Sequence, residues 1–190
     1  MAGSIVVFSG FQRSGKTFLA ALIAQYYHNY GAPVYTNMID TDFNFIDKLS
    51  DIPLDRNPKV VLLDELHFFL NARNFKDQAD FVYFINTICK RNILFLGTTI
   101  DADFIDKYLR KQMHYFVIAK KDKSFLNYKI IDVQRNVKKL ISFKMCPELF
   151  NYVNYNTEEV PRMFKFDIDK FIQLNEDISK GVTSNKVFFD

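Results

Sequence analysis

Apolar residues along this chain gather in short runs, and longer segments with a helical repeat separate the runs. Runs of three to five apolar or β-branched residues occur at 4–8, 34–36, 60–63, 93–96 and 115–118. Such runs are typical of strands buried on both faces of a parallel sheet. Helices are predicted between them at 18–30, 80–91 and 101–111, and apolar residues in 80–91 recur at i, i+3, i+4 and i+7. We therefore expect a three-layer α/β domain with a mainly parallel sheet.

The pattern changes after residue 118. Residues 125–133 and 138–144 predict two strands in close succession with no helix between them, so we expect them to be antiparallel. A short helix is predicted at 45–49 inside a polar loop, and another helix at 167–176. No linker divides the chain, so we expect one domain over 1–190. Its parts are a core at 3–120, an antiparallel extension at 121–160, and a C-terminal helix and tail at 161–190.

Composition adds limits on the class of protein. No run of eighteen apolar residues occurs, and we expect a chain that neither spans a membrane nor is exported. Cys89 and Cys146 lie far apart in no ligand spacing, which favours a reducing compartment. Residues 81–150 hold 13 Lys and Arg against 6 Asp and Glu, a balance of +7, within a chain of net charge +3. This local excess points to an anionic partner, although charged faces are usually only solvated.

A glycine-bounded turn follows the first predicted strand and precedes the first predicted helix. Residues 10–17 read Gly-Phe-Gln-Arg-Ser-Gly-Lys-Thr, the complete G-x-x-x-x-G-K-[ST] pattern of a P-loop. The glycines let successive N–H groups point at phosphate, and the helix N-terminus adds its positive end. The pattern predicts a P-loop NTPase that binds ATP with Mg²⁺. The predicted nucleotide-binding residues are Gly10, Arg13, Ser14, Gly15, Lys16, Thr17 and Phe18.

Two acidic residues, Asp64 and Glu65, follow the apolar run at 60–63. A P-loop site requires such acidic residues after a buried strand to bind the metal and activate water. Asp64, at the carboxyl end of the strand, and the hydroxyl of Thr17 are the predicted Mg²⁺ ligands. Glu65 is the predicted catalytic base, because a carboxylate beside the metal can accept a proton from the attacking water. Lys16 is predicted to neutralise the β- and γ-phosphates. The alternative for Asp64 and Glu65 is an acidic surface pair that follows a buried strand.

Thr98 and Thr99 end the strand that, in a P-loop sheet of order 5-1-4-3-2, lies between the first strand and the strand before Asp64. A polar side chain there can contact the γ-phosphate or the attacking water, and Thr99 is included among the catalytic candidates. Two β-branched residues that simply end a strand are the equally good alternative.

A neighbouring subunit could supply a positive charge that contacts the γ-phosphate. Three arginines are candidates for this role: Arg73, Arg91 and Arg110. Each is equally well explained as a surface ion pair. The histidines His28, His67 and His114 have no metal-ligand spacing and are interpreted as packing or surface residues.

Several segments together resemble the FtsK–HerA superfamily of DNA-pumping ATPases. They are residues 64–73, Lys90-Arg91 before an apolar strand, Thr98-Thr99, and the segments 105–110 and 155–160. Over about residues 3–160 the chain is most similar to genome-packaging ATPases of tailless, internal-membrane double-stranded DNA viruses. It also resembles the zonula occludens toxin domain of filamentous phages. One departure is Ile100, which stands where the family has a sensor glutamine; either Thr98 or Thr99 takes over that contact, or hydrolysis is coupled to movement differently.

The resemblance implies a homomeric ring, a pentamer or hexamer, with ATP between subunits and an arginine supplied in trans; we rank Arg91 first and Arg73 second. It implies sequence-independent binding of double-stranded DNA, docking to a capsid vertex or membrane protein, and a place in the host cytoplasm or with the virion. The expected function is therefore an ATP-hydrolysing motor that packages a viral genome.

Three other functions stay open from the sequence. One is a purely structural nucleotide-dependent switch, because a sequence gives no turnover rate. A filamentous-phage morphogenesis or secretion ATPase shares the core but commonly carries a membrane-spanning segment. A nucleoside or nucleotide kinase would need a lid with phosphate-binding arginines and an acceptor pocket.

Six lysines around the predicted antiparallel strands either contact DNA in a central channel or protect a strand edge from aggregation. These lysines are Lys120, Lys121, Lys123, Lys129, Lys138 and Lys139.

Overall fold

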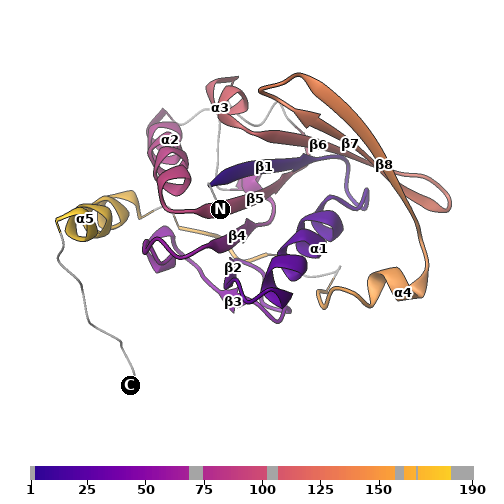
Figure 1. The fold of residues 1–190 in the computed structure, drawn as a ribbon, viewed down its shortest axis with the longest axis horizontal. Coiled ribbons are helices and arrows are strands. Elements are labelled where there is room, and N and C mark those ends of the chain that lie inside the picture. The colour runs from indigo at the N-terminus through magenta and orange to yellow at the C-terminus, as the bar shows by residue number, and fades with distance from the viewer. Residues whose placement is uncertain (1–2, 69–74, 102–106, 157–160, 166, 181–190) are drawn as a thin grey trace.

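The fold is built on one eight-stranded sheet of order β3-β2-β4-β5-β1-β6-β7-β8 (Figure 1). The computed structural model describes residues 3–68, 75–101, 107–156, 161–165 and 167–180. The first six strands of this order, from β3 to β6, pair in parallel. β7 pairs antiparallel with β6, and β8 pairs antiparallel with β7. The strands are β1 (Ser4–Ser9), β2 (Val34–Thr36), β3 (Asn44–Phe45), β4 (Lys59–Leu63), β5 (Ile93–Thr99), β6 (Tyr115–Lys121), β7 (Phe125–Asp132) and β8 (Val137–Lys144).

Helices cover both faces of the sheet, which makes three layers (Figure 1). The α-helices are α1 (Lys16–Asn29), α2 (Phe75–Lys90), α3 (Lys107–Gln112), α4 (Pro147–Phe150) and α5 (Ile168–Ser179). Two 3₁₀ turns occupy Leu49–Asp51 and Leu66–Phe68. This architecture confirms the predicted α/β P-loop fold with an antiparallel extension.

The core divides into two clusters because side chains alternate along each strand. In β1, Val6 and Phe8 pack with α1, whereas Ile5 and Val7 pack in the cluster that holds α2 and α5. β5 lies between β4 and β1, so the predicted neighbour relation of the threonine-ended strand is confirmed. The carboxyl ends of β1, β4 and β5 therefore meet at one edge of the sheet.

The predicted helix at 45–49 is wrong. Asn44 and Phe45 form β3, which pairs in parallel with β2, and a helical turn begins only at Leu49. The side chain of Asn44 donates to the Val34 carbonyl at 3.0 Å, and the Ile46 N–H donates to the Thr36 carbonyl at 2.8 Å. Pairing with β2 thus overrides the local helical pattern.

Other element ends also differ from the predictions. Helix α1 begins at Lys16, so Lys16 and Thr17 both belong to its first turn. Strand β5 continues to Thr99, and α5 continues to Ser179. Both cysteines are free thiols. Among the described residues, no helix is long and apolar enough to cross a membrane.

Candidate active site

The P-loop joins β1 to α1 through backbone that leaves no room for side chains at two positions. Gly15 has φ +89°, and a Cβ there would lie 2.8 Å from the Tyr128 hydroxyl oxygen. A Cβ on Gly10 would lie 2.6 Å from the Ala119 carbonyl oxygen. Arg13 also adopts positive φ, at +61°. The glycines are therefore required by close packing against β6 and β7 as well as by the turn.

Ser14 lies within the loop with its side chain almost completely buried. Its Oγ has no hydrogen-bond partner among the described residues. Buried hydroxyls are normally paired, so an orphaned hydroxyl in this loop suits the binding of a phosphate oxygen.

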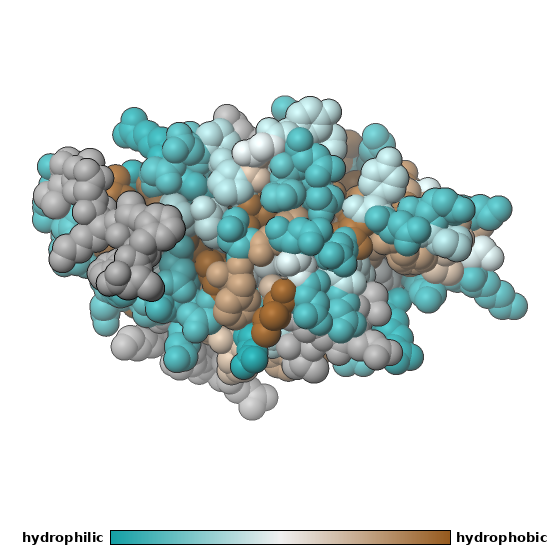
Figure 2. All heavy atoms as spheres, turned by 90° about the horizontal axis from the view of Figure 1, so that it is seen from below, coloured by the Kyte–Doolittle hydropathy of each residue, from teal (hydrophilic) through white to brown (hydrophobic). Residues whose placement is uncertain are grey.

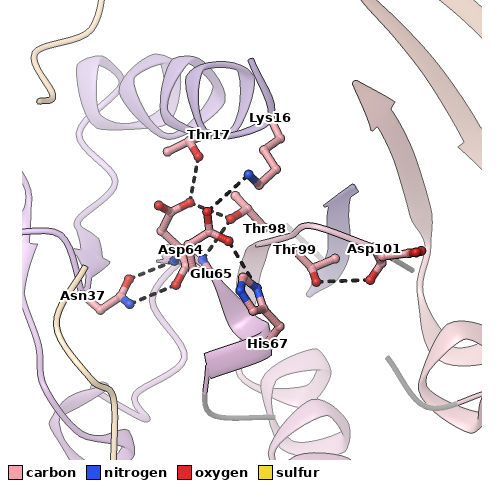
Figure 3. A network of polar contacts seen from close by, with 9 residues as sticks. All are labelled: Lys16, Thr17, Asn37, Asp64, Glu65, His67, Thr98, Thr99 and Asp101. Carbon is pink, nitrogen blue, oxygen red and sulfur yellow. Dashed lines mark hydrogen bonds and ion pairs between the residues drawn. The ribbon is translucent and has the colours of Figure 1, made fainter. Parts of the chain in front are cut away.

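Asp64 and Glu65 leave the carboxyl end of β4 in a tightly held turn (Figure 3). Asn37, which follows β2, accepts from the Asp64 N–H at 2.8 Å and donates to the Asp64 carbonyl at 3.1 Å. Glu65 adopts φ +55°, and its N–H donates to Thr98 Oγ1 at 3.0 Å. A non-glycine residue in this conformation is held by its surroundings, here by the Thr98 hydroxyl.

The Asp64 carboxylate faces two hydroxyls. Thr17 Oγ1 donates to Asp64 Oδ1 at 2.9 Å, and Thr98 Oγ1 donates to the same oxygen at 2.6 Å. Burial raises the pKa of Asp64, although the hydrogen bond from Thr98 opposes this. A divalent cation would stabilise the ionised carboxylate, and the Thr17 and Asp64 oxygens are the hard ligands that Mg²⁺ prefers. The two predicted metal ligands are thus adjacent and chemically suited to Mg²⁺.

Glu65 lies between two nitrogens. Lys16 Nζ is 3.2 Å from Glu65 Oε1, and His67 Nδ1 is 3.2 Å from Glu65 Oε2 (Figure 3). Burial lowers the pKa of His67, although the charge of Glu65 opposes this. The contact between His67 Nδ1 and Glu65 Oε2 is not a hydrogen bond, so the predicted base is held mainly by the P-loop lysine at Oε1.

A cavity of about 700 Å³ opens over these residues. Its lining combines the P-loop, Asp64 and Glu65 with apolar side chains. The rings of Phe18 and Phe150 lie 5.2 Å apart, and Leu126 and Met145 also line the cavity. Charged and apolar groups in one cavity suit the phosphates and the base of a nucleotide.

Comparison with known proteins assigns this chain to a family. The profile of the ATPase family associated with various cellular activities (AAA) matches residues 6–120, more than half of the chain. This chain belongs to the AAA ATPases. No match was found among curated protein sequences. The family assignment agrees with the predicted P-loop and with the geometry of Lys16, Asp64 and Glu65.

Three solved structures are similar in fold to this ATPase. The N-terminal domain of zonular occludens toxin from Neisseria meningitidis has a TM-score of 0.59 at 13% identity, covering 82% of this chain and all of that domain. The genome packaging NTPase B204 from Sulfolobus turreted icosahedral virus 2, in complex with AMPPCP, has a TM-score of 0.59 at 9% identity. The match covers 77% of this chain and all of B204. A DnaB-like replicative helicase has a TM-score of 0.56 at 10% identity, and the match covers 77% of this chain and 56% of the helicase. At these identities the likeness concerns the fold.

The two threonines at the end of β5 point to different partners in this ATPase. Thr98 contacts both Asp64 and Glu65, whereas Thr99 Oγ1 donates to the Asp101 carbonyl at 3.2 Å (Figure 3). Ile100 follows them and is partly exposed. Thr98, rather than Thr99, is the threonine that the fold brings to the acidic pair.

Arg91, the first-ranked candidate arginine, lies away from the P-loop of its own chain. Arg91 precedes β5, at the opposite end of that strand from Thr98, and its guanidinium bonds to Asn175 of α5. Arg110 is partly exposed in α3, and Arg73 lies outside the described residues. A role for Arg91 in a neighbouring subunit stays a prediction.

Sequence reasoning missed three groups of the site. Asn37 is a polar residue just after a strand that neighbours β4, and that position alone is a usable signal. His67 follows Glu65 by two residues, but its orientation depends on the 3₁₀ turn. Lys121 lines the cavity from the end of β6, which no local pattern indicates.

Proposed function

We propose that this protein is an ATP-hydrolysing motor of the FtsK–HerA type that moves double-stranded DNA, packaging a viral genome into a preformed capsid. The observation that carries the hydrolytic part is the contact of Lys16 with Glu65 beside the Thr17–Asp64 pair. In this proposal residues 1–190 act as one domain.

The contact between Lys16 and Glu65 suggests how nucleotide binding would prepare the site. The phosphates of ATP would draw the Lys16 ammonium away from Glu65, because they carry the larger negative charge. Glu65 would then be free to accept a proton from a water, with His67 still beside its other oxygen. Thr17 and Asp64 would hold Mg²⁺, which neutralises the developing charge on the phosphates.

The antiparallel extension supports a DNA-binding surface on one face only. Strand alternation and register place four exposed lysines on the face turned away from α1: Lys120, Lys129, Lys138 and Lys144. Leu126 and Tyr128 occupy the opposite face and pack with α1. Figure 2 shows the molecule from the side on which α1 lies, and hydrophilic side chains cover much of the part that projects at the right. Lysines on one face can contact phosphates without reading bases, as a motor on any genome requires.

This division changes which lysines belong to the DNA proposal. Lys144 joins the set, although sequence reasoning passed over it. Lys121 and Lys139 leave it, because they alternate onto the α1 face, and Lys121 lines the nucleotide cavity. Lys123 lies in the turn between β6 and β7.

The likeness to the genome packaging NTPase B204 supports the packaging function. The proposal adds a homomeric ring, a pentamer or hexamer, with Arg91 or Arg73 supplied in trans. A ring at a capsid vertex or beside a membrane protein, in the host cytoplasm or with the virion, completes the proposal.

A secretion or morphogenesis ATPase of the zonula occludens toxin type is the second candidate. The likeness to the whole N-terminal domain of that toxin favours it. A nucleoside or nucleotide kinase is the third candidate from the sequence. Glu65 beside Lys16 counts against it, because a kinase transfers phosphate to its substrate and needs no base there for water.

An ATPase assay with and without double-stranded DNA tests the proposal. We expect phosphate release to increase when duplex DNA is added, because translocation couples the two. Unchanged release with DNA would favour the secretion ATPase. Transfer of labelled phosphate to an added nucleoside would contradict hydrolysis and establish a kinase.

A further inference from the structure

A second cavity, of about 620 Å³, lies between α2 and α5. It is at the amino end of β5, whereas the P-loop and Thr98 lie at the carboxyl edge of the sheet. Three cationic side chains line it: Arg56, Lys90 and Arg91. No acidic side chain is among the described residues of its lining.

Arg91 is the buried member of this group, with 8% of its surface exposed. Its Nε and Nη2 donate to Asn175 Oδ1 at 3.1 and 2.6 Å, and Nη2 also donates to Ser179 Oγ at 3.3 Å. Its hydrogen-bond partners among the described residues are neutral. Buried charges in proteins are normally paired with an opposite charge, so this guanidinium lacks the usual anionic partner.

Among the described residues, the charges around Arg91 do not neutralise it. Lys59, which is 1% exposed, pairs with Asp55 at 3.0 Å, and this pair has no net charge. Burial lowers the pKa of Lys59, and the nearby charge of Arg91 lowers it further. Arg56, Lys90 and Arg91 are then left as three positive charges around one cavity.

We propose that this cavity is a second phosphate-binding site, which takes the phosphates of a nucleotide. Asn175 and Ser179 accept from Nε and Nη2 of Arg91 and so fix the guanidinium, which leaves Nη1 to donate to a phosphate oxygen. The Thr87 hydroxyl and the Tyr83 ring also line the cavity and suit a small ligand. A cavity between two helices fits a nucleotide better than it fits duplex DNA, which needs an open surface.

The phosphates have two sources with the same chemistry: a free nucleotide, or a nucleotide in the P-loop of a neighbouring copy. The second source rests on the proposed ring, whereas the first does not. Asn175 is on this view a positioning residue, because it holds one edge of the guanidinium while the cavity receives the ligand.

The test uses the full chain with Lys16→Ala, so that the P-loop contributes as little as possible. Pyrophosphate binding is measured by titration calorimetry in this background. Adding Arg56→Ala and Lys90→Ala is expected to weaken binding at least about tenfold, because two charge-assisted contacts are lost. Both side chains are at least partly exposed, so the fold should persist; thermal unfolding checks this. Lys180→Ala removes an exposed lysine at the end of α5, outside the cavity lining, and is expected to leave binding unchanged.

Three results would overturn the site: no pyrophosphate binding, equal binding by the double variant, or equal weakening by Lys180→Ala. Binding of a short duplex but not of pyrophosphate would also contradict it. Repeating the titration with ADP in the chain that retains Lys16 separates the sources. Binding of two ADP molecules per chain at all protein concentrations supports a free nucleotide in the cavity. Binding of one ADP per chain, weakened by Arg56→Ala and Lys90→Ala only above the assembly concentration, supports the neighbour's. No readout requires hydrolysis or movement, so failure here leaves the motor proposal untouched.

Discussion

The hydroxyl of Tyr128 donates to the Gly15 carbonyl at 2.9 Å, which joins β7 of the antiparallel extension directly to the P-loop. Tyr128 is completely buried, and Leu126 from the same strand packs against Gly15. The Gly15 carbonyl also accepts the Leu19 N–H of α1 at 3.1 Å. The strand that carries Lys129 on its exposed face therefore supports the phosphate-binding turn with its buried face.

Tyr128→Phe should destabilise the protein by about 1 kcal/mol, because one buried hydrogen bond is lost while Leu19 still satisfies the Gly15 carbonyl. Tyr128→Ala should cost about 3–5 kcal/mol, because it also leaves a cavity. Urea unfolding measures both. Tyr152→Phe, at a largely exposed tyrosine, is the control and should have no effect. Equal stability of Tyr128→Phe and the parent protein would show that the hydrogen bond does not support the loop.

Lys16→Ala and Glu65→Gln should separate binding from hydrolysis. The first removes the main side-chain charge on the phosphates, so nucleotide binding should be lost. The second keeps the shape of the side chain but cannot accept a proton, so binding should persist while hydrolysis falls about 10²–10⁴-fold. Fluorescent nucleotide titration and phosphate release measure the two effects. Turnover by Glu65→Gln at the parent rate would rule out Glu65 as the base.

Thr98→Val should reduce hydrolysis far more than Thr99→Val. The valine fills the same space but cannot bond the Asp64 carboxylate or accept the Glu65 N–H, so both acidic residues lose their support. Thr99→Val is the matched control, because its hydroxyl contacts only the Asp101 carbonyl among the described partners. Steady-state kinetics of the two variants decides between them, and a larger loss from Thr99→Val would return the sensor role to Thr99.

Mixing two inactive variants tests whether an arginine acts in trans. Arg91→Ala keeps an intact P-loop, and Lys16→Ala keeps an intact arginine, so mixed interfaces should recover activity. An arginine supplied in this way contributes roughly 10³-fold or more in rate. Recovery with Arg73→Ala but not with Arg91→Ala would reverse the ranking. If specific activity did not change with protein concentration across the assembly range, catalysis between subunits would be excluded.

Lys120, Lys129, Lys138 and Lys144 should carry duplex DNA binding together. Each alanine replacement is expected to flatten the slope of log affinity against log salt by about one unit, because one counterion fewer is released. Lys139→Ala, on the opposite face of β8, is the matched control. Unchanged DNA affinity with lower solubility in the four-lysine variant would instead identify the lysines as protection of the β8 edge.

The sequence determined the P-loop, the acidic pair and the parallel core, because each depends on short-range pattern. A buried strand is read from consecutive apolar residues such as 60–63, and the residues after it necessarily lie at the carboxyl edge of the sheet. The P-loop needs its glycines and lysine at fixed spacing along the chain, so Lys16, Thr17 and Asp64 could be assigned without coordinates.

Only the tertiary structure decided which side chains meet across long distances in the chain. Thr98 and Thr99 are the same residue type at adjacent positions, and only the pleat of β5 turns the first toward Asp64. Lys120 and Lys121 are likewise separated by strand alternation onto opposite faces. Tyr128 reaches Gly15 across 113 residues because β7 folds back beside β6, and no local pattern encodes that contact.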